Sequence, residues 1–167
     1  MQPRTHLSSA IILGAALSAS AMAADAPQKI SGSQVETVAE QHVEKIGSEA
    51  HILSLIRLEG KNSGSFLDGA TTHSMSIGDF INGNGPFHGY IMFEETNNGS
   101  VTFLYTGQLT TTPVGGKPKT EWTLTWQIVD GTGRFATVRG QGIAHGGEIA
   151  ERQNRTDWEG TATGVPQ

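Results

Sequence analysis

The stretch Glu121–Gly142, EWTLTWQIVDGTGRFATVRGQG, decides the fold class of this chain. Its first half alternates polar residues with four apolar ones, Trp122, Leu124, Trp126 and Ile128. A period of two with aromatic and branched residues is typical of a β-strand that buries one face. The glycines at 131 and 133 then permit turn conformations that other residues avoid. The stretch therefore predicts a β-hairpin, with a return strand over residues 134–144 and two tryptophans in the core.

Composition agrees with short strands and tight turns. Glycine accounts for 22 of the 167 residues, about twice its average usage, and only 16% of residues are charged. The formal charge of −5 and the lack of a clustered Lys/Arg face argue against nucleic-acid binding. The chain has no cysteine, which excludes thiol chemistry and thiolate metal sites.

Residues 1–23 have the features of a secretory signal peptide. Arg4 supplies one positive charge, Leu7–Ala19 is apolar with small side chains, and Ala21-Met22-Ala23 fits the cleavage rule. The apolar run is short and weakly hydrophobic for a membrane span. We expect a periplasmic or secreted mature protein without membrane contact, the alternative being an N-terminal anchor.

The next segment predicts a helix. Ser33 and Glu36 match a capping box, apolar residues follow at helical spacing, and Gly47 stands where a helix ends. We expect one amphipathic helix over Gln34–Ile46, covering an end of the domain or, alternatively, binding a partner. Residues 24–49 would then form an N-terminal extension, and residues 50–167 the main domain.

From residue 50 onward the pattern is β throughout. Besides the opening hairpin, strands are expected at His51–Glu59, Thr71–Ile77, Phe87–Glu95, Ser100–Thr111, Ile149–Asn154 and Thr156–Thr163. Turn signals such as Asn98-Gly99 join them as hairpins. About eight strands in this order predict an all-β fold, an eight-stranded antiparallel β-barrel with one short N-terminal helix and an interior for one small ligand.

Four stretches carry a family resemblance: GDFINGNGPFHGYIMF (78–93), LYTGQLTTTPVGGKP (104–118), WTLTWQIVDGTGRFATVRGQG (122–142) and DWEGTATG (157–164). Together they resemble bacterial proteins of the allene oxide cyclase/dirigent barrel group, over residues 52–164. The resemblance implies an eight-stranded barrel with an apolar cavity, often trimeric in the plant members. It also implies cofactor-free reactions: cyclisation of an unsaturated fatty-acid epoxide, steering of phenoxy-radical coupling, or cycloaddition. No plant active-site motif matches residue by residue, so no catalytic residue is carried over.

Candidate catalytic groups come from strand parity. Tyr105 shares the apolar face of its strand, and Arg139 shares parity with Phe135, so both are expected to point inward. A guanidinium inside a barrel needs a partner, and Glu59 or Glu94 near a strand end could supply one. Such a set could protonate or orient an oxygenated substrate. The alternative is a structural ion pair at the rim.

Candidate ligand-binding groups are aromatic: Trp122, Trp126, Phe103 and Tyr90. They would form a wall for a flat hydrophobic ligand, or else simply fill the core. Both faces of Phe87–Glu95 are partly apolar, which favours a homo-oligomer, a dimer or trimer. The standard nucleophile and phosphate-binding motifs are absent. The histidines form no short-spaced pair, so no metal or other cofactor is expected, although barrel strands could bring His51, His73 and His88 together.

These observations leave three functional classes open. The first is a cofactor-free isomerase or cyclase acting on a small hydrophobic, oxygenated molecule. The second is a non-catalytic, lipocalin-like binding barrel, and the third a solidly packed structural or interaction barrel. The content of the barrel interior distinguishes them, because fold alone does not determine function.

Overall fold

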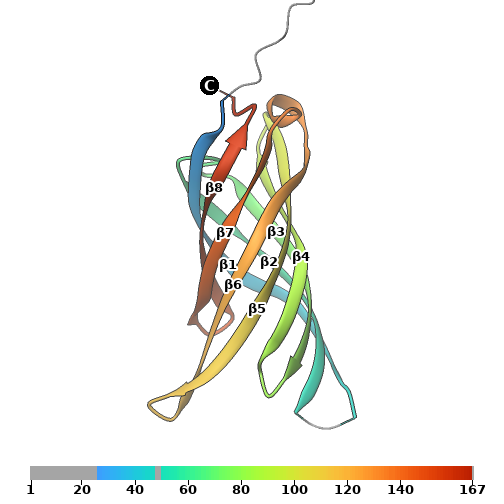
Figure 1. Cartoon of the computed structure of the whole chain (residues 1–167). Coiled ribbons are helices and arrows are strands. Elements are labelled where there is room, and N and C mark those ends of the chain that lie inside the picture. The colour runs from blue at the N-terminus through green and yellow to red at the C-terminus, as the bar shows by residue number, and fades with distance from the viewer. Residues whose placement is uncertain (1–25, 48–49, 167) are drawn as a thin grey trace, which may run out of the picture.

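The protein forms one closed barrel of eight antiparallel strands (Figure 1), seen in a computed structural model that describes residues 26–47 and 50–166. The strands follow one another around the barrel in chain order: β1 (Gln28–Lys45), β2 (His51–Gly64), β3 (Thr71–Ile81), β4 (Gly85–Glu95), β5 (Gly99–Val114), β6 (Lys117–Gly131), β7 (Arg139–Ala150) and β8 (Gln153–Thr163). Strand β8 pairs with β1 and closes the barrel. The predicted eight-stranded antiparallel barrel is confirmed.

The helix predicted over Gln34–Ile46 is wrong, because this segment lies in strand β1. Strand β1 is hydrogen-bonded to β2 on one side and to β8 on the other. Two neighbouring strands satisfy its backbone groups, and this tertiary pairing overrides a weak local helical preference. The domain boundary expected at residue 50 is wrong for the same reason, since β1 is part of the barrel wall.

Two boundaries near the C-terminus also differ from expectation. Residues 149–154, predicted as a strand, form the end of β7, a turn and the start of β8. The return strand expected from residue 134 begins only at Arg139, because Gly133–Phe135 first forms a short 3-10 helix, η1. The barrel keeps eight strands because β1 replaces the strand that was expected at 149–154.

One end of the barrel is closed by side chains. The β2–β3 loop places Phe66 and Leu67 there, and the segment between β6 and β7 adds Phe135 and Val138, all of them buried. The rings of Phe66 and Phe135 meet edge to face, with centroids 6.0 Å apart. The beginning of β1 and the end of β8 lie at this end, at the top of Figure 1. These four side chains form a plug that closes this end of the interior.

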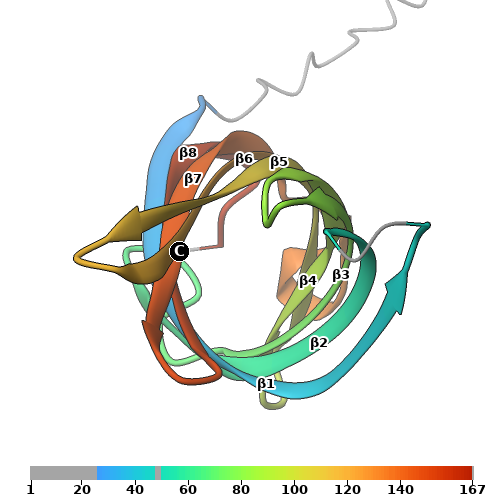
Figure 2. The ribbon, with the colours of Figure 1, turned by 90° about the horizontal axis from the view of Figure 1, so that it is seen from below.

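The tryptophans of the core lie against glycines on neighbouring strands. A Cβ atom at Gly142 would stand 2.4 Å from Cζ2 of Trp126, and one at Gly160 would stand 2.6 Å from the same atom. Gly32 makes room for Trp158 in the same way, and Gly146 for Trp122. Part of the high glycine content therefore provides space for large rings inside a narrow barrel. Figure 2 looks along this barrel from the end opposite the plug.

The predicted signal peptide, residues 1–23, lies outside the described residues. Within the described part of the chain, no helix has the length and apolar content needed to span a bilayer.

Candidate functional site

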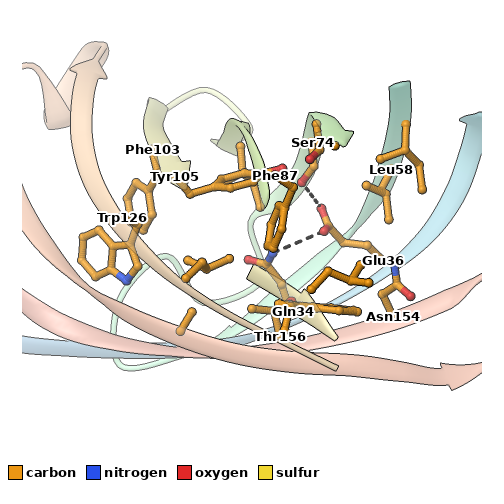
Figure 3. Close-up of a pocket in the computed structure, with 18 of the residues that line it drawn as sticks. Gln34, Glu36, Leu58, Ser74, Phe87, Phe103, Tyr105, Trp126, Asn154 and Thr156 are labelled. Atoms are coloured by element: carbon orange, nitrogen blue, oxygen red, sulfur yellow. Dashed lines mark hydrogen bonds between the residues drawn. The ribbon is translucent and has the colours of Figure 1, made fainter. Parts of the chain in front are cut away.

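The barrel encloses a cavity of about 200 Å³ with two chemically different halves (Figure 3). The polar half is formed by strands β8, β1, β2 and β3, which adjoin one another because the barrel is closed. Its polar side chains are Gln34, Glu36, Gln41, Ser54, Ser74, Ser76, Asn154 and Thr156. The opposite half is lined mainly by aromatic and aliphatic side chains of β4, β5 and β6.

Glu36 is the acidic group of this cavity. Its parity in β1 directs the side chain inward, and it is 5% exposed. Ser74 Oγ donates a hydrogen bond to Glu36 Oε1 at 2.6 Å, and Gln34 Nε2 donates to Oε2 at 3.3 Å. Both bonds are drawn in Figure 3. The carboxyl group is therefore held in a defined position at the cavity wall.

Burial raises the pKa of Glu36 above its ordinary value of 4.5. Loss of hydration disfavours the charged carboxylate, whereas the hydrogen bonds from Ser74 and Gln34 favour it and oppose the rise. Burial also raises the pKa of Tyr105, so its phenol keeps its proton at neutral pH. In both groups burial therefore favours the protonated form.

The rings of the aromatic half pack against one another. The ring of Phe103 stacks on Trp126 with centroids 4.4 Å apart and an interplanar angle of 14°. Trp158 meets both rings edge to face. The indole N–H of Trp126 donates to the carbonyl of Ile143, and that of Trp122 donates to Thr156 Oγ1. With their polar atoms satisfied, these rings present flat apolar faces.

Exposure of the lining residues shows which end of the cavity is open. Phe93, Phe103 and Trp158, toward the plug, are buried. Toward the opposite end, Leu109 is half-buried and Gln41 is exposed. The cavity therefore opens at the end formed by the β1–β2, β3–β4, β5–β6 and β7–β8 hairpins.

Four of the residues predicted from the sequence line this cavity: Tyr105, Trp122, Trp126 and Phe103. Their inward orientation follows from the alternation of β5 and β6. The hydroxyl of Tyr105 lies over Gly89, where a Cβ atom would approach it to 2.7 Å. The functional roles of these four residues remain predictions.

The other four predicted residues lie outside the cavity, which corrects the expected inward ion pair. Arg139 is exposed and donates to the carbonyls of Ala136 and Val138, because η1 breaks the alternation that linked it to Phe135. Glu59 and Glu94 are on the outer face, near Arg57 and His73 respectively. Tyr90 is 54% exposed on the outside of β4.

Sequence reasoning missed Glu36 and Gln34 because it placed both in a helix. The run Gln34-Val35-Glu36-Thr37 also alternates with a period of two, with branched residues at its second and fourth positions. Read as a strand, it places either the branched residues or the Gln/Glu pair inside. In the structure the Gln/Glu pair faces inward. The alternation of these two polar residues was therefore the sequence signal that could have indicated a polar cavity.

The histidines do not form a metal site in the described part of the chain, where no cluster of three or more His, Asp or Glu side chains is placed to hold an ion. His51 contacts Asp79 at 2.6 Å and His73 contacts Glu94 at 3.8 Å. Both pairs lie on the outer surface of the barrel and do not line the cavity.

Comparison with known proteins supports the fold. No family model matches the chain, and no curated protein sequence matches it. Among solved structures, the chain is similar to the pterocarpan synthase dirigent protein GePTS1, with a TM-score of 0.51 and 11% sequence identity. The match covers 86% of this chain and 93% of that protein. The barrel is therefore dirigent-like in fold; at this identity the likeness concerns the fold alone.

Proposed function

We propose that this barrel takes up one small, largely apolar, oxygen-bearing molecule and rearranges it without a cofactor, as an isomerase or cyclase. The observation that carries this proposal is the position of Glu36, a buried carboxyl group facing an aromatic wall across a cavity. A carboxylic acid that keeps its proton in an apolar site is a common device for acid catalysis near neutral pH.

The contacts of Glu36 suit a proton that leaves and returns. Glu36 donates a proton to an oxygen of the bound molecule, and the resulting carboxylate is stabilised by the hydrogen bonds from Ser74 and Gln34. The carboxylate then takes a proton from a carbon of the same molecule. The atoms balance within one substrate, which is the requirement for an isomerisation. The aromatic half would hold the molecule in one reactive conformer.

A non-catalytic binding barrel is the second candidate, supported by the mainly apolar character of the lining. The cavity itself weighs against the third expectation, a solidly packed structural barrel. Native mass spectrometry of the protein purified from its own host, followed by extraction, identifies the bound molecule. Incubation of that molecule with protein then shows whether it is converted.

Glu36→Gln is the decisive variant, because it keeps the shape of the side chain and removes the acid. Loss of conversion by about 100-fold or more, with binding retained, is expected for a general acid. Glu40→Gln, an exposed position on the same strand, is the matched control. Equal conversion by wild type and Glu36→Gln would show that Glu36 is not the general acid. If wild type and both variants all fail to convert the molecule, the barrel is a non-catalytic binding protein.

We also propose that the protein is exported and that its mature chain begins after Ala23. The support is the sequence of residues 1–23. N-terminal sequencing of the protein recovered from a periplasmic fraction tests this, and an intact Met1 on the recovered protein contradicts it.

A further inference from the structure

We propose that the molecule bound in the cavity is uncharged and carries a hydrogen-bond donor, so that carboxylates, sulfates and phosphates are excluded. This inference rests on the proposed function, because it names the ligand class of the same cavity. It depends on three properties of the interior: its charges, one unsatisfied acceptor and its size.

The cavity offers nothing to pair with an anion. Its lining in the described part of the chain contains one carboxyl group, Glu36, and no lysine, arginine or histidine. Two basic groups of the adjacent strands β2 and β3 have acidic partners outside the cavity: Arg57 lies near Glu40 and Glu59, and His73 near Glu94. An anionic ligand would lose its hydration and gain no counter-charge, which is costly in a buried site.

An organic cation is also disfavoured, although less strongly. Only the ionised form of Glu36 could pair with a cation, and burial disfavours that form. Both partners would then be charged and removed from water, and desolvation commonly offsets the attraction of such a pair. An uncharged ligand avoids both costs.

Gln34 adds the requirement for a donor. Its side chain is 8% exposed and lines the cavity. Nε2 is used toward Glu36, whereas Oε1 has no hydrogen-bond partner among the described residues. Buried acceptors are normally satisfied, so a vacant one beside a cavity calls for an O–H or N–H of a ligand.

The cavity volume limits the size of the ligand. An apolar cavity of roughly 150 Å³ is enough for benzene, and this one holds about 200 Å³. A single ring with a short substituent therefore fits. Benzyl alcohol, toluene, benzoate and benzylammonium form a probe set of nearly constant shape, differing in donor and charge.

Binding of the four probes to the mature protein by ligand-observed NMR tests the inference. Benzyl alcohol is expected to bind tightest, toluene roughly 10-fold more weakly because it lacks the donor, and benzoate on the order of 100-fold more weakly because it is charged. At a pH low enough to protonate benzoate, its affinity should rise toward that of benzyl alcohol. Tryptophan fluorescence verifies that the barrel remains folded at that pH.

The outcomes separate this inference from the proposed function. Benzoate or benzylammonium binding as tightly as benzyl alcohol at neutral pH overturns the charge selectivity but leaves a ligand cavity in place. Gln34→Met should abolish the difference between benzyl alcohol and toluene, whereas Gln108→Met, at an exposed position of β5 outside the cavity, should preserve it; a difference that survives in Gln34→Met overturns the donor requirement. If no probe binds, both the inference and the proposed function fail.

Discussion

The carboxyl group of Glu36 links the stability of the barrel to pH. Because burial raises its pKa in the folded state, the unfolded chain loses this proton near pH 4.5 while the folded chain keeps it. The free energy of unfolding therefore falls as pH rises from about 4.5 through the folded-state pKa. Below about pH 4.5 the carboxyl group is protonated in both the folded and the unfolded chain, and this loss of stability is absent.

We expect Glu36→Gln to remove this dependence. Urea unfolding of wild type and variant over a pH series should give curves that diverge above pH 4.5, with the variant gaining relative stability. Glu40→Gln should follow wild type, because Glu40 is exposed. Parallel curves for wild type and Glu36→Gln would mean that Glu36 titrates normally in the folded protein.

Glycine at position 142 leaves room for the ring of Trp126 inside the barrel. We expect Gly142→Ala to destabilise the protein by roughly 1–3 kcal/mol or more, because overpacking forces Trp126 or the backbone of β8 to move. Gly147→Ala, on the same strand, is the control, since its new methyl group would meet no ring and its nearest atom, at 3.0 Å, is the carbonyl oxygen of Thr120. Thermal melts measure both; equal melting temperatures for the two variants contradict the packing argument.

Among the elements, β1 shows where inference from sequence succeeds and fails. Strands with apolar residues inside, such as β5 and β6, were predicted correctly because burial and alternation agree. In β1 the apolar Ile30 is buried, but so are the polar Gln34 and Glu36, whereas Val35 is exposed. Polar residues face inward only because the interior holds a cavity, and this is a property of the closed barrel. Local pattern alone could not supply it, so the catalytic candidate was missed.

The plug formed by η1 and the β2–β3 loop is the element that closes one end of the barrel. We expect Phe135→Ala to cost about 3–5 kcal/mol, because the ring is 1% exposed and leaves a cavity against Phe66. Thr137→Ala, at an exposed position two residues later, should change stability by no more than about 0.5 kcal/mol. Chemical denaturation measures both, and a loss below about 1 kcal/mol for Phe135→Ala would show that the plug is dispensable.

The outer surface of the whole molecule carries an apolar face across β2, β3 and β4. Leu55 pairs with Ile77, Met75 pairs with Tyr90, and all four side chains are exposed. Apolar surface of this kind on a folded domain commonly marks an interface, which agrees with the homo-oligomer expected from the sequence.

We therefore expect native mass spectrometry to show a dimer or trimer, and Ile77→Glu to shift it toward monomer. Val114→Glu, which changes an exposed apolar residue in the β5–β6 hairpin, should leave the assembly intact. A wild-type protein that stays monomeric at micromolar concentration contradicts the expectation.

For the molecule as a whole, the barrel was predictable because glycine turns and alternating strands are local signals. Which end of the barrel is closed and which is open was not predictable. The closed end depends on contact between Phe66 and Phe135, two residues that are 69 positions apart in the sequence. Aromatic lining residues were identified from alternation, whereas the polar half required knowing that β8, β1, β2 and β3 are neighbours.

The polar half of the cavity lies across the seam where the first and last strands meet. Synthesis delivers β1 early, yet its partner β8 comes more than a hundred residues later in the chain. Until then, the nascent chain exposes an unpaired edge at β1, the kind of surface that invites aggregation. Gln34 and Glu36 gain Asn154 and Thr156 as neighbours only when the seam closes. The newly made protein therefore has no complete cavity before its final strand is in place.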